Sequence, residues 1–143
     1  MPKIEIHNCK EAPKPLGSYC HAASYGDLIF VAGIASRDLV TNQVPGLKLD
    51  STGKKISYDI RAETKGTLEN IQTILKSVGS DLEHIIDVNV FLLDMKDFPA
   101  YNEVYSQYFT RHTPARTTVA VAGLPGNIAI EIKVVAVKGQ NNQ

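Results

Sequence analysis

One stretch of helical periodicity, set between segments that alternate like strands, constrains the fold of this chain more than any other feature. Between Asp59 and Val78, apolar side chains recur mainly at helical spacings, and charged side chains occupy the other faces. The apolar positions are Ile60, Leu68, Ile71, Ile74, Leu75 and Val78. Gly79 follows at once, and glycine readily takes the left-handed conformation that ends many helices. The spacing therefore predicts a helix over residues 59–78.

The last apolar stretch, residues 128–137, has the period of two that is typical of a strand. Its branched aliphatic side chains share one face: Ile128, Ile130, Ile132 and Val134. Glu131 falls on the opposite face, away from the isoleucines. Residues 85–93 are apolar on both faces apart from Asp87 and Asn89. This second pattern predicts a strand that is covered on both sides.

Shorter patterns predict an edge strand at 4–7 and further strands at 20–24, 28–35 and 117–122. Residues 25–27 have the composition of a hairpin turn. A second helix is predicted to begin near Asp97, its candidate N-cap, and to run to Phe109. The order of strands, helix, strand, helix and strands describes one α+β domain over residues 1–143. Both helices are expected on one face of a mixed sheet.

The connection between residues 36 and 58 has no sustained period and is rich in turn-forming residues. One short strand is predicted near 47–49. Connections of this length inside a compact domain often cover a site. Residues 139–143 are predicted to be a flexible tail.

Charge and hydropathy exclude several classes of partner. The 143 residues include fifteen lysines and arginines and fifteen aspartates and glutamates. This balance provides no positive field that would attract nucleic acid or an anionic membrane surface, and it does little to oppose self-association. The longest apolar runs, 28–35 and 88–93, are too short to cross a membrane. Since the N-terminus also lacks an apolar signal segment, we expect a soluble, cytoplasmic protein.

The remaining chemical motifs exclude several kinds of site. Cys9 and Cys20 are expected to be free thiols in a reducing compartment. Together with the four histidines they show no metal-ligand spacing. The sequence also lacks a glycine-rich phosphate loop, a nucleophile elbow and the zinc deaminase signature. Neither a metal site nor a cofactor is therefore predicted.

Arg116 stands where a loop becomes a strand, within Pro114-Ala115-Arg116-Thr117-Thr118. The pattern alone leaves two interpretations, a solvated cation at a strand entrance or a carboxylate clamp. A guanidinium group can bind a carboxylate through two parallel hydrogen bonds, which positions a ligand while other groups carry out the chemistry.

At this segment the chain resembles the reactive intermediate deaminases, also called the RidA or YjgF family. The resemblance covers residues 17–137 and depends on the order and spacing of several short motifs. These are Gly17-Ser18-Tyr19, Val31-Ala32-Gly33, Asp97-Phe98 with Tyr101-Asn102, Pro114-Ala115-Arg116, Leu124-Pro125 and Ile130-Glu131-Ile132.

The resemblance implies a chorismate-mutase-like α+β fold and a homotrimer with a small-ligand cleft at each subunit interface. It also implies hydrolysis of enamines and imines to ketones and ammonia without a metal or an organic cofactor. Arg116 would bind the substrate carboxylate, helped by backbone groups near Gly33 and Thr118.

The same resemblance implies roles for three more side chains. Tyr19 and Asn102 would line the pocket, and Glu131 would position the substrate or protonate it at the reacting centre. The chain departs from the usual family pattern at Ser18, where proline is common, and at Thr118, where cysteine is frequent. Ala32-Gly33-Ile34 also replaces a frequent Ser-Gly-Gln. A cysteine-based mechanism is thereby excluded at position 118.

Several of these departures resemble a narrower group, the 2-aminomuconate deaminases of bacterial aromatic degradation. These enzymes convert 2-aminomuconate to 4-oxalocrotonate (2-oxohex-3-enedioate) and ammonia. Since 2-aminomuconate is a dicarboxylate, Arg37 is a candidate for holding the carboxylate that Arg116 does not; the alternative is a solvated loop charge. The matching stretches are Ser36-Arg37, Asp59-Ile60-Arg61-Ala62, Leu68-Glu69-Asn70-Ile71, Ser77-Val78-Gly79-Ser80, Tyr101-Asn102-Glu103-Val104 and Arg116-Thr117-Thr118-Val119-Ala120-Val121.

Glu131 also has two interpretations, an ion pair with Lys133 or another cation, and a proton-transfer group. The resemblance favours the second, and burial beside an apolar strand would raise the pKa of its carboxyl group. Three other functions stay open beside the specialist deaminase: a general 2-imino acid deaminase, a non-catalytic small-ligand-binding trimer, and an RNA-directed activity. The balanced charge argues against the last.

Overall fold

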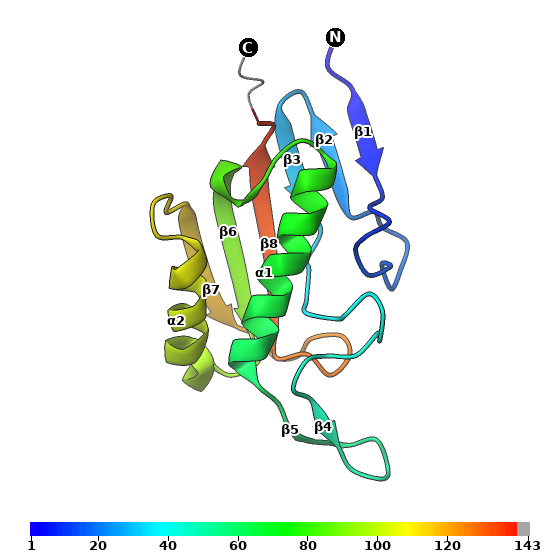
Figure 1. Ribbon diagram of the computed structural model, residues 1–143, viewed down its shortest axis with the longest axis vertical. Coiled ribbons are helices and arrows are strands. Elements are labelled where there is room, and N and C mark those ends of the chain that lie inside the picture. Colours follow the sequence, from blue (N-terminus) through cyan, green and yellow to red (C-terminus); the bar gives the residue numbers. More distant parts are fainter. Residues whose placement is uncertain (140–143) are drawn as a thin grey trace.

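A six-stranded mixed sheet carries both α-helices on one of its faces (Figure 1). The computed structural model describes residues 1–139. All neighbouring strands are antiparallel except β6 and β7, which are parallel. In spatial order the strands are β1 (Ile4–His7), β2 (Ala22–Tyr25), β3 (Leu28–Val31), β8 (Ile130–Val137), β6 (Ile85–Leu92) and β7 (Ala115–Ala120).

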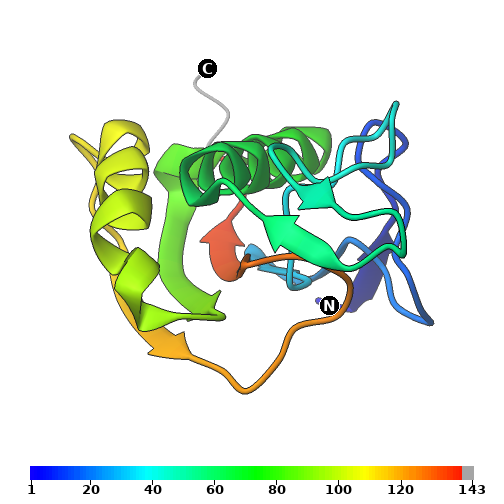
Figure 2. The same cartoon turned by 90° about the horizontal axis from the view of Figure 1, so that it is seen from below.

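This arrangement confirms the predicted α+β class, the edge position of β1 and the hairpin between β2 and β3. Seen from below, both helices lie on the same side of the sheet and neither covers its other face (Figure 2). The predicted tail at 139–143 lies, after Gly139, outside the described residues.

Helix α1 (Ile60–Ser77) has the ends that the sequence predicts. The Asp59 carboxylate accepts a hydrogen bond from the Ala62 N–H at 3.0 Å and caps the first turn. Val78 closes the last turn, and Gly79 follows with a φ of +80°. The helix therefore begins and ends within one residue of the predicted limits.

Helix α2 (Phe98–Tyr108) also matches its prediction, but the expected cap is used differently. Asp97 occupies the N-cap position without capping a helix N–H. Its carboxylate instead accepts a hydrogen bond from the Tyr58 hydroxyl at 2.6 Å, which ties the start of α2 to the residue before the α1 cap. Two short 3₁₀ helices, η1 (Leu82–His84) and η2 (Met95–Asp97), precede β6 and α2.

The hydrophobic core lies between the helices and the sheet. α1 packs on the two central strands, β8 and β3, and its apolar stripe forms one core with the inner side chains of β8 and of the neighbouring β6. Burial of such aliphatic side chains is the main favourable contribution to folding. The fully buried members are Leu68, Ile71, Ile74, Leu75, Val88, Val90, Leu92, Ile130, Ile132 and Val134.

The prediction that β6 is covered on both faces is wrong for the single chain. Its inner side chains are buried, but Asp87, Asn89 and Phe91 are only half-buried and Ile86 is 46% exposed. The reason is that both helices pack on the same face. The opposite face, which we call the open face, also exposes Phe30 of β3 and Val119 of β7.

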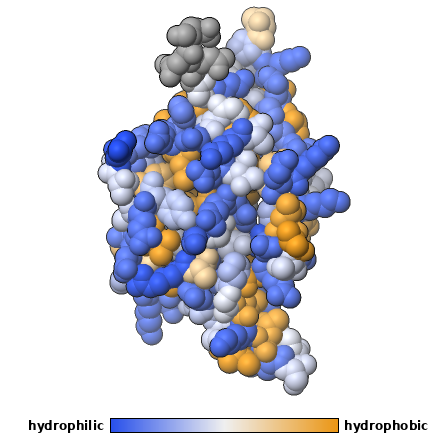
Figure 3. Space-filling view, in the orientation of Figure 1, coloured by the Kyte–Doolittle hydropathy of each residue, from blue (hydrophilic) through white to orange (hydrophobic). Residues whose placement is uncertain are grey.

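The connection over residues 36–58 contains two short strands where one was predicted. β4 (Lys48–Leu49) confirms the expected strand near 47–49, and β5 (Lys55–Ser57) pairs with it. β5 was missed because its side chains are largely exposed and give no apolar period. Figure 3 shows hydrophobic surface at this hairpin on an otherwise mainly hydrophilic helix-covered side.

No helix within the described residues 1–139 is long and apolar enough to span a membrane.

We expect Gly79→Ala to destabilise the protein by about 1–2 kcal/mol, because an L-residue is strained in the left-handed conformation. A Cβ at this position meets no other atom within 4 Å, so the cost is one of backbone conformation alone. Gly123→Ala is the matched control, since its Cβ is equally unobstructed and its φ is not positive. Urea unfolding at fixed protein concentration measures both. An equal effect of the two substitutions would contradict the conformational explanation.

Candidate functional site

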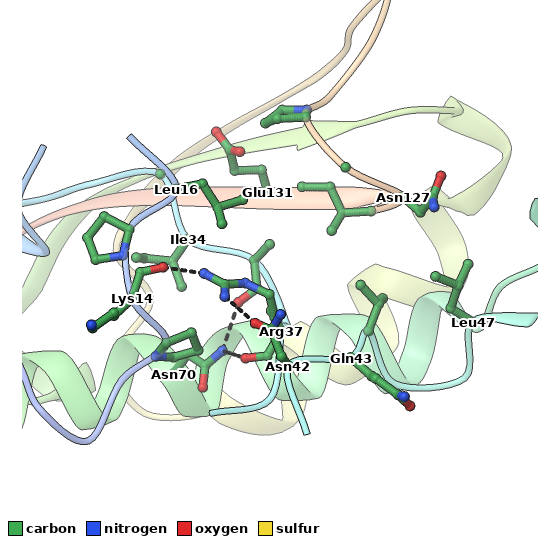
Figure 4. Close-up of a pocket in the computed structure, with 18 of the residues that line it drawn as sticks. Lys14, Leu16, Ile34, Arg37, Asn42, Gln43, Leu47, Asn70, Asn127 and Glu131 are labelled. Carbon is green, nitrogen blue, oxygen red and sulfur yellow. Dashed lines mark hydrogen bonds between the residues drawn. The ribbon is translucent and has the colours of Figure 1, made fainter. Parts of the chain in front are cut away.

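A cavity of about 610 Å³ lies where the end of β3, the start of β8 and the N-terminal loops meet α1 (Figure 4). Its walls are mainly apolar, with few charged groups. Four of the predicted site residues line it: Tyr19, Gly33, Arg37 and Glu131.

Glu131 lies on β8 with its side chain half-buried. Burial raises the pKa of its carboxyl group, and the nearby positive charge of Lys133 partly opposes this effect. Lys133 does not pair with it, because the Lys133 ammonium donates to the Val31 carbonyl at 2.9 Å. Within residues 1–139 the carboxylate of Glu131 makes neither an ion pair nor a hydrogen bond. The alternative interpretation of Glu131 as an ion-pair partner is therefore wrong for the described chain.

Gly33 lies directly against the Glu131 side chain. A Cβ on Gly33 would collide with the Glu131 carboxylate. The neighbouring Ile34 forms an antiparallel bridge with Ile132, which holds this backbone directly against β8. The absence of a side chain at position 33 therefore leaves the space that the carboxylate occupies.

Arg37 lines the same cavity on the α1 side of β8, whereas the Glu131 carboxylate points to the other side (Figure 4). Its guanidinium group donates to the Asn42 side-chain oxygen and to the Lys14 carbonyl. Asn70 of α1 supports this loop by donating to the carbonyls of Ala35 and Arg37, at 2.9 and 3.1 Å. Because these acceptors are neutral, the charge of Arg37 is not compensated by a carboxylate within the described residues.

Tyr19 and His21 form the N-terminal wall of the cavity. Tyr19 is 52% exposed, and its hydroxyl accepts a hydrogen bond from the Leu16 N–H at 3.2 Å. His21 is buried; its Nδ1 accepts from the Cys9 N–H at 2.8 Å, and its Nε2 donates to the Pro13 carbonyl at 2.6 Å. His21 thus fixes the loop that carries Tyr19. Cys9 and Cys20 are free thiols, as predicted.

The other three predicted site residues gather where α2, which carries Asn102, meets β7, which carries Arg116 and Thr118. Arg116 of β7 donates to the Asn102 side-chain oxygen at 2.8 Å. Thr118, two residues along the strand, shares a hydrogen bond of 2.6 Å with the Tyr101 hydroxyl. Arg116 is half-buried, so the interpretation of a freely solvated cation is wrong.

Three aromatic side chains to which the sequence patterns assigned no role in the site enclose Arg116. The guanidinium carbon lies 4.6 Å from the ring centre of Tyr105, 5.4 Å from Tyr101 and 5.7 Å from Phe98. Rings stacked on a guanidinium group stabilise its charge and restrict its orientation. Burial also raises the pKa of the Tyr105 hydroxyl to about 12, so this group stays neutral. The helical spacing of aromatic residues in α2 was the available signal.

Arg116 and Glu131 lie on opposite faces of the sheet. Arg116 is in register with Val88, which faces the helices and is buried. Glu131 is in register with Phe91, which faces the other way. The predicted site residues therefore form two groups in one chain. One lies between α2 and β7, and the other at the cavity: Arg116, Asn102 and Thr118 in the first, and Tyr19, Gly33, Arg37 and Glu131 in the second.

Among residues 1–139, no three histidine, cysteine, aspartate or glutamate side chains lie close enough together to hold a metal ion.

We expect Lys133→Met to raise the pKa of Glu131 further, because it removes the positive charge that opposes the effect of burial. The acid form would then persist to a higher pH. Carbon-13 NMR titration of the glutamate carboxyl groups measures the change directly. Lys3→Met, an exposed lysine on the N-terminal segment, is the control and should leave the titration unchanged. A pKa of Glu131 that falls or stays the same in Lys133→Met would refute this electrostatic account.

The family model described as Endoribonuclease L-PSP matches residues 9–138. A RutC family protein of Pyrococcus abyssi is 40% identical over 135 residues, which cover 94% of this chain and 97% of that protein. Reactive Intermediate Deaminase A, chloroplastic, of Arabidopsis thaliana is 35% identical over 134 residues, covering 94% of this chain and 66% of that protein. The structure of E. coli TdcF with bound serine superposes with a TM-score of 0.80 at 30% identity, covering 94% of this chain and 99% of that one.

Proposed function

We propose that this chain, which belongs to the RidA/YjgF family described by the Endoribonuclease L-PSP model, is a hydrolytic deaminase of enamine and imine carboxylates. The observation that carries the proposal is Glu131, a half-buried carboxyl group with a raised pKa and no partner within the described residues. Groups of this kind occur where proton transfer is needed.

The reaction requires little beyond orientation and proton transfer. An enamine first takes a proton at carbon and loses one from nitrogen, and so becomes an imine. Water then adds to the imine carbon, and the tetrahedral adduct expels ammonia to leave a ketone. Glu131 in its acid form can donate the proton, and in its ionised form it can accept one from the attacking water. Because the substrate is intrinsically reactive, binding it in one orientation beside this group supplies most of what is needed.

Arg116 is the proposed anchor for the substrate carboxylate. Asn102 accepts from only one guanidinium nitrogen, so other N–H groups are available for a bidentate contact. The aromatic rings of Tyr101, Tyr105 and Phe98 hold the guanidinium group in place before the ligand arrives. The bound serine of E. coli TdcF supports a ligand of this class, since serine also carries a carboxylate.

We propose that the complete site forms between two copies of the chain in a homotrimer. Arg116 and Glu131 lie on opposite faces of one sheet, and Arg116 does not line the cavity that Glu131 shares with Arg37, so a ligand that contacts both Arg116 and Glu131 needs a second copy. The open face supports this assembly because it exposes apolar side chains, among them Phe30 and Val119, at 42% and 41%. One subunit would contribute the Arg116 group and its neighbour the Glu131 cavity.

The proposed substrate is 2-aminomuconate, and the product is 2-oxohex-3-enedioate in the degradation of aromatic compounds. The six stretches that resemble the 2-aminomuconate deaminases support this assignment. The uncompensated charge of Arg37 in the cavity supports it as well, because a dicarboxylate needs a second cation.

The first test measures ammonia release from 2-aminomuconate, generated enzymatically in place, and from 2-iminobutyrate. We expect faster release from 2-aminomuconate. Arg116→Ala should lower kcat/KM about 100-fold or more for both substrates, because each loses its charged partner. Arg37→Met should lower kcat/KM about tenfold for the dicarboxylate alone.

The outcomes separate the alternatives. Equal or better activity on 2-iminobutyrate would identify a general 2-imino acid deaminase. Tight binding without ammonia release from either substrate would identify a ligand-binding trimer and refute the enzyme. RNA cleavage that Glu131→Gln does not affect would indicate the activity named in the family description, against which the balanced charge argues.

A subunit-mixing experiment tests the shared site. Glu131→Gln should lower kcat about 100-fold or more while changing the binding of substrate little. When Glu131→Gln and Arg116→Ala chains are refolded together in equal amounts, about one quarter of the interfaces in a cyclic trimer carry both native residues. We therefore expect about one quarter of the wild-type activity to return.

The matched control mixes Arg116→Ala with Asn102→Ala. These two residues are hydrogen-bonded within one chain, so no interface regains both, and activity should not exceed that of the single variants. Recovery in the control, or none in the first mixture, would contradict a site shared in this way.

A further inference from the structure

Glu63 is a buried carboxyl group that the proposed reaction does not use. Its side chain has no exposed surface and lies on the core-facing side of α1. Oε1 accepts a hydrogen bond from the Ala129 N–H at 2.9 Å, and Oε2 has no partner within residues 1–139. Carboxylates are rarely buried without a role, because burial without full pairing is costly.

The partner of Glu63 lies next to the start of β8. The Ala129 carbonyl accepts a hydrogen bond from the Leu93 N–H at 3.0 Å. Both the N–H and the carbonyl of Ala129 are therefore hydrogen-bonded. β8 begins at the next residue, and Glu131 is two residues along. The predicted strand began at Ile128, whereas the observed strand begins at Ile130; the Ala129 N–H just before it bonds to the Glu63 side chain instead of to a neighbouring strand. The position of Glu131 along the cavity therefore depends on where Ala129 is anchored.

We propose that Glu63 is a positioning residue for Glu131, acting through the Ala129 N–H that it binds at the entrance to β8. The proposal rests on the proposed function, in which Glu131 transfers the proton. The hydrogen bond by which Glu63 anchors the start of β8 can be measured without any enzyme assay.

The anchor changes strength near neutral pH. Burial, together with the negative charges of Asp97 in η2 and Asp59 at the α1 N-cap, raises the pKa of Glu63 to about 7; the Ala129 hydrogen bond and Lys55 of β5 oppose this rise. A carboxylate accepts a stronger hydrogen bond than a neutral carboxylic acid. As pH rises through 7, the Ala129 N–H is therefore held more tightly and Glu131 is more narrowly positioned.

The direct test is a pH titration of the backbone amide resonances by nitrogen-15 NMR of the full chain. In the wild type we expect the Ala129 amide to shift with a midpoint near pH 7. Glu63→Gln keeps the shape and an acceptor oxygen but cannot ionise, so its Ala129 amide should not titrate in this range. Glu69→Gln, an exposed glutamate on the same helix, is the control and should behave like the wild type.

Glu63→Ala tests the coupling to Glu131. Without the anchor, the pKa of Glu131 should move, and kcat should fall about ten- to 100-fold because small displacements of a reacting group are costly. KM should change less, because Arg116 is untouched. Glu63→Gln keeps a neutral acceptor, so its kcat should lie between those of Glu63→Ala and the wild type and should lose the dependence on pH near 7.

Three results would overturn the proposal: an Ala129 amide that does not titrate near pH 7, one that titrates equally in Glu63→Gln, or a Glu131 pKa unchanged in Glu63→Ala. These results differ from a failure of the proposed function. A wild-type protein that releases no ammonia would remove the catalytic meaning of Glu131, but its Ala129 titration would still decide whether Glu63 anchors β8.

Discussion

The packing of α1 on β8 and β3 is the interaction on which the rest of the structure depends. It buries the apolar stripe of the helix and the inner side chains of both strands. The same helix carries the polar contacts of the cavity: Asn70 holds the loop before and after Ser36, and Glu63 holds the entrance to β8. A Cβ on Gly66 would lie 3.1 Å from the Ser36 Cβ, so the loop packs closely on the helix. The apolar core thus sets the distance between the cavity walls.

Placing both helices on one face has a direct consequence for the chemistry. Side chains alternate along each strand, so residues on β7 and β8 reach either the helix-covered side or the open face. Arg116 and Thr118 fall on the first, where α2 supplies aromatic partners. Glu131 falls on the second, beside Gly33. The alternation of side chains along the strands therefore places Arg116, the proposed carboxylate anchor, and Glu131, the proposed acid, on opposite faces of the sheet.

The sequence predicted the elements that depend on local pattern. Both helices, the central strands and the α+β order follow from the apolar period. The end of α1 follows from Gly79, which takes a positive φ. β5 and the later start of β8 could not be predicted, because exposed hairpin residues give no period and the Glu63 contact joins positions far apart in the chain. The coverage of β6 was overestimated because apolar composition does not tell whether a helix or another subunit covers a face.

In the candidate site, too, local patterns predicted single residues but not the relation between residues far apart in the chain. Alternation along β8 predicted that Glu131 faces away from the isoleucines, but no local pattern relates that face to the one occupied by Arg116. Their separation has an energetic benefit in the proposed assembly. A guanidinium group next to Glu131 in the same chain would form an ion pair, lower the pKa of the carboxyl group and occupy the donors meant for the ligand. In the proposed assembly the two groups would lie on different subunits, and a carboxylate-bearing substrate would lie between them.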